Sequence, residues 1–391
     1  MDPLPLPPGI RSRFVDNGNG LAVHLLEAGF DSPGRPCILL LHGFPELAYS
    51  WRKILLPLAE AGYHVVAPDQ RGYGRTTGWE AGFDTNLSSF RLLNLVQDAL
   101  GVVDATGHRH VEAVIGHDFG SPVAAWCSLL RPEIFRRVVI MSAPFAGPPG
   151  LSSGTQAAGE TPAAPPSSPA SFLEDPIHHD LARLSPPRKH YQCYYSGPEA
   201  NRDMWRCPQG ISAFLRAYFH VKSGDWTNNR PHRLSGWRAE ELAKLPEYYI
   251  MPLEKGMAET VAPYMPAEAD IAGATWLPES ELQVFAHEFG RTGFQGGLSW
   301  YRAVATGRFA PELQLYAGKT IDVPALFVAG ESDWGVYQKP GSFEAMQRQA
   351  CSDFRGAHFI AGAGHWVQQE RPAALLRALL PFLESGYRSA E

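Results

Sequence analysis

Residues 111–130 read VEAVIGHDFGSPVAAWCSLL, and this stretch decides the fold. Its apolar start predicts a buried strand over residues 111–115, and residues 122–130 predict a helix. Between them, Gly116-His117-Asp118-Phe119-Gly120 has the pattern of a nucleophile elbow, with Asp in the place usually held by Ser. Gly-x-Asp-x-Gly alone is as typical of a turn with a capping Asp. The strand before it and the helix after it favour the elbow.

Further apolar runs predict the rest of a sheet. They alternate with amphipathic stretches, a pattern typical of βαβ units and of a doubly wound, mostly parallel sheet. The expected strands cover residues 37–41, 64–67, 111–115, 138–142, 325–329 and 357–360. Before them, residues 12–16 and 21–29 predict an antiparallel hairpin around an Asn-Gly turn. The chain is therefore expected to have an α/β fold.

The strand pattern is interrupted in the middle of the chain. Residues 147–170 are rich in Pro, Ser, Ala and Gly, and residues 171–309 have a largely helical pattern with clustered aromatic side chains. We interpret this segment as a cap inserted between two late strands of one sheet. The expected organisation is a core formed by residues 1–146 and 311–391, with a linker and helical cap over residues 147–310.

A carboxylate nucleophile in this fold needs an acid and a histidine later in the chain. His365 follows the last expected strand in the glycine-rich sequence Gly362-Ala363-Gly364-His365-Trp366, and a helix is expected over residues 372–383. For the acid, the strand 325–329 is followed by both Glu331 and Asp333. We favour Asp333, with Glu331 as its competitor.

The loop after strand 37–41 is expected to stabilise an oxyanion. It reads His42-Gly43-Phe44-Pro45-Glu46, at the place where this fold supplies a backbone N–H to the oxyanion hole. The N–H groups of Phe44 and Phe119 would then converge on one oxygen. His42 is expected to order the loop by hydrogen bonding.

The choice of Asp rather than Ser narrows the chemistry. A carboxylate can displace a leaving group from saturated carbon and form an alkyl ester with the enzyme, which points to epoxides or alkyl halides. His365, oriented by Asp333, would activate water against the ester on Asp118.

These motifs resemble those of the soluble epoxide hydrolases, from His42-Gly43-Phe44-Pro45-Glu46 through Gly116-His117-Asp118 to Gly364-His365-Trp366. The resemblance implies an α/β-hydrolase fold and two cap tyrosines that donate to the epoxide oxygen. The matching positions are Tyr191, followed by Gln192, and Tyr301, within Leu298-Ser299-Trp300-Tyr301-Arg302. The residues expected to contact substrate are Phe44, Pro45, Phe119, Gln192, Trp334 and Trp366.

The sequence departs from that family in two places. Phe119 stands where the family often has Trp, and the cap contains an unfamiliar stretch over residues 224–274. A haloalkane or haloacid dehalogenase is an alternative, although such enzymes typically place Trp or Arg directly after the nucleophile. A non-catalytic ligand-binding protein on the same scaffold is a second alternative, because fold does not fix function.

Composition sets broader limits. The chain has 391 residues, 45% of them hydrophobic, and a net charge of -6, which argues against nucleic acid as a partner and favours a small neutral epoxide. The five cysteines lack the spacing of a zinc site, so we expect free thiols, no metal and no cofactor. With no signal peptide or membrane span apparent, we expect a cytoplasmic protein, and a homodimer is compatible with the sequence.

Overall fold

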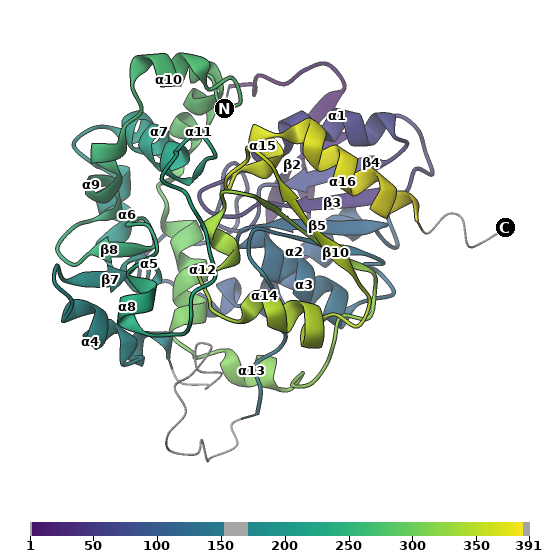
Figure 1. The fold of residues 1–391 in the computed structure, drawn as a ribbon. Helices are drawn as coiled ribbons and strands as arrows, with labels where there is room; N and C mark the ends of the chain where they lie inside the picture. Colours follow the sequence, from purple (N-terminus) through teal and green to yellow (C-terminus); the bar gives the residue numbers. More distant parts are fainter. Residues whose placement is uncertain (1, 152–170, 386–391) are drawn as a thin grey trace.

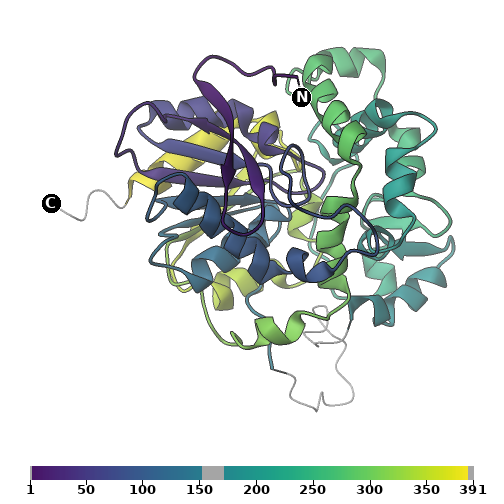
Figure 2. The same ribbon diagram turned by 180° about the vertical axis from the view of Figure 1, so that it is seen from behind.

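The structure, a computed structural model, describes residues 2–151 and 171–385 and is built around one eight-stranded sheet (Figures 1 and 2). The strand order is β1-β2-β4-β3-β5-β6-β9-β10. Strands β1 and β2 pair antiparallel, as do β2 and β4, and all other neighbours are parallel. The strands are β1 (Ile10–Asp16), β2 (Ala22–Ala28), β3 (Cys37–Leu41), β4 (His64–Pro68), β5 (Ala113–His117), β6 (Val138–Met141), β9 (Ala325–Gly330) and β10 (Phe354–Ile360). The predicted mostly parallel sheet and N-terminal hairpin are confirmed.

Helices on both faces explain why the inner strands are apolar throughout. Every residue of β3, β4, β5, β6 and β9 is buried, as parallel strands between two helical layers require. Helices α1 and α16 pack together on one face, and α2 and α3 pack together on the other (Figure 1). The core helices are α1 (Arg52–Glu60), α2 (Leu92–Ala105), α3 (Gly120–Leu130), α14 (Ser342–Ala345), α15 (Val367–Glu370) and α16 (Pro372–Glu384).

The elements between β6 and β9 form a separate layer of mostly short helices, which we call the cap (Figure 1). Its helices are α4 (Ile177–Ala182), α5 (Tyr191–Tyr195), α6 (Ala200–Trp205), α7 (Ile211–Lys222), α8 (Ala239–Leu242), α9 (Met257–Val261), α10 (Glu268–Gly273), α11 (Glu279–Thr292), α12 (Gln295–Ala305) and α13 (Ala310–Gln314). The expected linker lies largely outside the described residues. We propose residues 147 and 310 as the limits of the linker and cap, so that α13 crosses the later limit into the core.

The cap also contains a feature that the sequence pattern did not predict. Strands β7 (Arg188–His190) and β8 (Ile250–Pro252) pair antiparallel. Each has three residues, too few to show a period of two in the sequence.

None of the helices in residues 2–151 and 171–385 has the length and apolar character of a membrane span.

The cap is held to the core by direct backbone and ionic contacts. The indole Nε1 of Trp300 donates to the carbonyl oxygen of Arg71 at 2.8 Å, and Arg75 forms a buried ion pair with Glu288 at 2.7 Å. The backbones of Gly72 and Gly296 meet so closely that a Cβ on Gly296 would lie 2.0 Å from the Gly72 oxygen. These contacts fix the cap above the carboxyl ends of the strands.

The turn between β5 and α3 is a close backbone crossing at this edge. Asp118 has φ 51°, in the left-handed region that side chains rarely adopt. A Cβ on Gly116 would lie 2.2 Å from the oxygen of Gly120, and one on Gly120 would lie 2.3 Å from the oxygen of Leu41. The glycines are therefore required by close backbone approach, which agrees with the predicted elbow.

We expect Gly120→Ala to destabilise the protein by about 1–3 kcal/mol, because the added methyl group would force backbone atoms apart. The midpoint of urea unfolding should fall accordingly. Gly290→Ala in α11 is the matched control, since a Cβ there meets nothing within 4 Å and alanine favours a helix. Equal midpoints for both variants would show that the elbow tolerates a side chain.

Candidate active site

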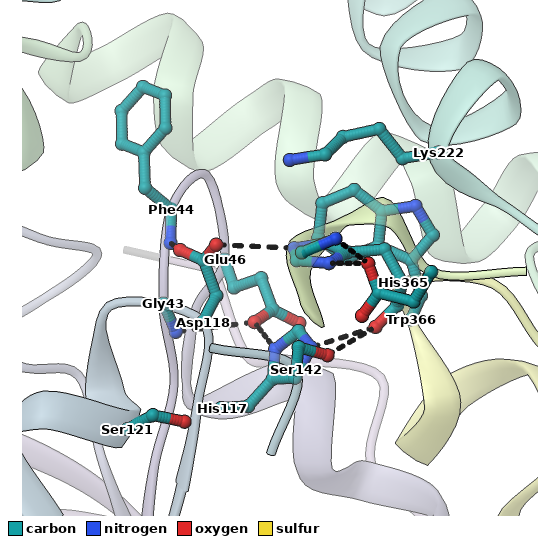
Figure 3. Close-up of polar contacts among 12 residues, drawn as sticks. Gly43, Phe44, Glu46, His117, Asp118, Ser121, Ser142, Lys222, His365 and Trp366 are labelled. Carbon is teal, nitrogen blue, oxygen red and sulfur yellow. Dashed lines mark hydrogen bonds and ion pairs between the residues drawn. The ribbon is translucent and has the colours of Figure 1, made fainter. Parts of the chain in front are cut away.

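Three buried side chains from different strand ends meet at the elbow. The Nε2 atom of His365 lies 3.2 Å from Oδ2 of Asp118 (Figure 3). The Nδ1 atom of His365 lies 3.1 Å from Oδ1 of Asp333. Asp118 follows β5, Asp333 follows β9, and His365 lies in the loop after β10. The structure thus brings together the nucleophile, the acid and the histidine that the sequence predicts. Glu331, the competing acid, is exposed.

The charges of this group stabilise one another. Burial and the charge of Lys222 lower the pKa of His365, but Asp333 and Asp118 outweigh them and raise it to about 9. Burial opposes ionisation of Asp118, yet its ion pair with His365 and the nearby positive charges hold its pKa below the usual range. The pKa of Asp333 is also lowered despite burial, chiefly by His365. At neutral pH the group is therefore an imidazolium between two carboxylates.

The backbone N–H of Phe44 donates to Oδ1 of Asp118 at 3.0 Å (Figure 3). This contact leaves Oδ2 as the oxygen beside His365. Within the described part of the chain, no hydrogen bond of the Phe119 N–H is found, so its place in an oxyanion hole stays a prediction. The His42 Nε2 atom accepts from the N–H of Gln70 at 3.1 Å, and this contact supports the predicted role of His42 in ordering the loop.

A buried network beneath the nucleophile was missed from the sequence. His117 Nδ1 lies 2.5 Å from a carboxylate oxygen of Glu46, and His117 Nε2 lies 2.8 Å from the carbonyl oxygen of His365 (Figure 3). Gln368 donates to the other Glu46 oxygen at 2.8 Å. The network ties the loop after β3, the elbow and the histidine loop together. Both Glu46 and His117 stand inside motifs noted in the sequence, but nothing local showed that they pair.

The two cap tyrosines are buried, and both lie within electrostatic reach of Asp118. The rings of Tyr191 and Tyr301 are 6.0 Å apart, and burial followed by the charge of Asp118 raises the pKa of both phenols well above its usual value. Both hydroxyls therefore keep their protons at neutral pH. The Tyr191 hydroxyl donates to Oε1 of Gln338 at 2.9 Å and accepts from the side chain of Gln192 at 3.0 Å. Gln338 is a second contact that the sequence did not reveal.

The other residues predicted to contact substrate are aromatic or apolar groups, of which Phe119 is half-buried and the rest are buried. The Phe119 ring packs edge-on against Tyr301 at 5.0 Å, and the Phe44 ring does so at 5.6 Å. Trp366 is fully buried, with its Nε1 donating to the carbonyl oxygen of Phe219. Pro45 and Trp334 are buried as well. Contact of these residues with substrate stays a prediction.

Comparison with known proteins identifies a family that matches this chain and relatives similar to it over nearly their whole length. Residues 36–372 match the sequence pattern of the alpha/beta hydrolase fold family. Epoxide hydrolase B of Mycobacterium tuberculosis is 31% identical over 94% of this chain and 96% of that protein. Epoxide hydrolase A of the same organism is 32% identical over 95% and 96%, respectively.

Solved structures of epoxide hydrolases are also similar to this chain. An epoxide hydrolase from an endophytic Streptomyces has 30% identity and a TM-score of 0.74, covering 98% of this chain and 97% of that one. Epoxide hydrolase A from Mycobacterium thermoresistibile has 31% identity and a TM-score of 0.72, covering 96% and 98%. The chain therefore belongs to the α/β-hydrolase fold family. Within that family it belongs with the epoxide hydrolases.

The choice between Asp333 and Glu331 can be tested by titration. Because Asp333 contributes charge and a hydrogen bond that raise the pKa of His365, Asp333→Asn should lower that pKa by about 1 to 3. Glu331→Gln, at an exposed position, should leave it unchanged. Nuclear magnetic resonance of labelled histidine rings measures both, with His365→Gln identifying the signal. A larger effect from Glu331→Gln would assign the acid to Glu331.

Proposed function

We propose that the protein converts an epoxide to a vicinal diol through an alkyl ester on Asp118. The observation that carries the proposal is a buried carboxylate at a nucleophile elbow, paired with His365 and within electrostatic reach of two buried phenols. Relatives named epoxide hydrolases over nearly the whole chain support the same reaction. The substrate would be a small epoxide, and no metal or cofactor takes part in the proposed steps.

In the first step, Oδ2 of Asp118 attacks a ring carbon of the epoxide. Oδ1 is already held by the Phe44 N–H, so the carboxylate is oriented before substrate arrives. The carbon–oxygen bond of the ring breaks, and its electron pair leaves with the oxygen. A phenol proton from Tyr191 or Tyr301 can be shared with that oxygen or transferred to it. Tyr191 would exchange its contact with Gln338 for one with the substrate.

In the second step, water attacks the carbonyl carbon of the ester. Alkylation removes the negative charge of Asp118, one of the two groups that raise the pKa of His365. The imidazolium can then give its proton, through water, to the phenolate left by ring opening, and the neutral imidazole accepts a proton from the attacking water. Asp333 orients the ring and stabilises the imidazolium that forms. Oδ1 becomes the oxyanion and keeps the Phe44 N–H as its donor. Collapse of this intermediate releases the diol and restores Asp118.

The alternatives explain less of the site. A dehalogenase would need a donor for the departing halide, and the Phe119 side chain, packed against Tyr301, has none to offer. A purely ligand-binding protein would not need the arrangement of Asp118, His365 and Asp333. The paired phenols are accounted for by the alkoxide that ring opening creates.

Separating the two steps tests the covalent mechanism. His365→Gln should still be alkylated by styrene oxide but should not hydrolyse the ester, because alkylation requires no base whereas hydrolysis does. Intact-protein mass should therefore rise by one substrate, with the adduct on the peptide containing Asp118. Asp118→Asn is the control and should show neither adduct nor diol, provided that mass spectrometry excludes reversion to Asp. Diol formation without any adduct in His365→Gln would contradict the mechanism, and halide release from haloalkanes would favour dehalogenation.

The tyrosines should act on the first step. Tyr191→Phe and Tyr301→Phe should each slow alkylation by roughly 10-fold to 1000-fold, since one donor to developing charge contributes about 1.4 to 4 kcal/mol. Hydrolysis of the ester should change much less. Stopped-flow measurements resolve the two rates. Tyr264→Phe, which removes a cap hydroxyl bonded to Glu247, should alkylate at the normal rate. Normal alkylation by both single variants would remove the tyrosines from the mechanism.

A further inference from the structure

A buried lysine beside the site has no part in the steps above. Lys222 is the last residue of α7 and is 4% exposed. Figure 3 shows its side chain over His365, with Nζ directed toward the space above Asp118. Nζ lies 3.5 Å from the Tyr218 hydroxyl, and no ion pair of Lys222 with a carboxylate within 4.0 Å is found across residues 2–151 and 171–385. Nothing in the local sequence marked this residue.

Aromatic rings take the place of a counter-ion around this ammonium group. Nζ lies 5.1 to 5.7 Å from the ring centres of four side chains: Tyr218, Tyr248, Tyr249 and Trp366. Such cation–π contacts offset part of the cost of burying a charge. The Lys222 charge also acts on Asp118 and on His365, two residues of the proposed mechanism.

The lysine is also tied to the histidine through the backbone. The N–H of His365 donates to the carbonyl oxygen of Lys222 at 2.8 Å. Gly364 permits this approach, because a Cβ there would lie 2.3 Å from the carbonyl carbon of Ser223. One carboxylate oxygen of Glu370 accepts from the N–H groups of both Gly224 and Gly364. These contacts hold the end of α7 at a fixed distance from the loop that carries His365.

We propose that Lys222 is a positioning residue that acts through its charge on His365. Once Asp118 has been alkylated, the ammonium group of Lys222 keeps the His365 imidazole neutral and able to accept a proton from water. The proposal rests on the proposed ester mechanism and goes beyond it by assigning a role to a cap residue in the second step.

The charges that face His365 make this role necessary. Before reaction, His365 contacts two carboxylates, and these hold it as an imidazolium. After alkylation, Asp118 is neutral and Asp333 still favours the protonated ring. His117 packs 4.9 Å from His365 and is paired with Glu46, whose negative charge also favours protonation. Lys222 is a cation that opposes them, as its lowering effect on the pKa of His365 indicates.

The first test needs no substrate. Asp118→Asn places a neutral group where the ester would be, and Lys222→Met removes the ammonium group while keeping an unbranched, apolar chain. The pKa of His365 should be higher by about 1 in the double variant than in Asp118→Asn alone, whereas adding Lys222→Arg should change it little. Labelled-histidine titration measures this, with mass spectrometry checking that the introduced amide has not reverted to a carboxylate. Equal pKa values with and without Lys222→Met, in variants with normal circular dichroism spectra, would overturn the proposal.

The second test follows the reaction in single turnovers of styrene oxide. In Lys222→Met, the pH midpoint for ester hydrolysis should move upward by about 1, so that hydrolysis below the midpoint slows about tenfold because less neutral imidazole is present. Alkylation should change less. Lys222→Arg should resemble the parent, as should Lys319→Met, which removes a lysine that lies over the ring of Tyr316.

Other outcomes would overturn the proposal in distinguishable ways. Equal slowing of both steps at every pH would indicate a structural role. A loss confined to epoxides that carry a carboxylate, without a shift of the midpoint, would make Lys222 a substrate anchor. If the parent protein forms no ester at all, the proposed function fails, and the titration of the Asp118→Asn variants still decides whether Lys222 controls His365.

Discussion

The left-handed backbone of Asp118 is the constraint on which the rest of the site depends. It is sustained because the loop after β3, the end of β5 and the start of α3 approach one another at glycines, where a Cβ would meet backbone atoms. This geometry lifts the carboxylate above the sheet, one oxygen on the Phe44 N–H and the other beside His365. With a right-handed backbone conformation at residue 118, the same side chain would point elsewhere. The carboxylate would then lie away from His365 and the Phe44 N–H.

Around this turn the protein buries an unusual density of charge. Two carboxylates, an imidazole and an ammonium group lie within one another's electrostatic reach, and each is tolerated because the others are present. In the proposed reaction, nucleophilic attack would move a negative charge away from Asp118, so the balance that favours imidazolium in the resting protein would change as the reaction proceeds. The core supplies the triad, while the cap supplies the phenols and Lys222. Cap and core therefore form one electrostatic unit.

Much of this could be predicted because chemistry in a parallel sheet gathers at the carboxyl ends of strands. Asp118, Asp333 and His365 each follow an apolar run, and helix α16 begins at the expected residue 372. The elbow strand itself was displaced by two residues, since Val111 makes only an isolated bridge with Phe135. Lys222 and Gln338 could not be found this way, because they belong to segments whose local pattern describes only helices and turns.

The sequence by itself determined which chemical groups were available and in what order: an Asp between glycines, a later acid and a histidine, each after a strand. Local periodicity and steric demand are sufficient for that, since both act over a few residues. Only the tertiary structure decided that Asp333 rather than Glu331 faces His365, that Glu46 pairs with His117 and that Lys222 lies over the imidazole. These relations depend on burial and on distances between segments far apart in the chain, and such quantities exist only once the whole chain has folded.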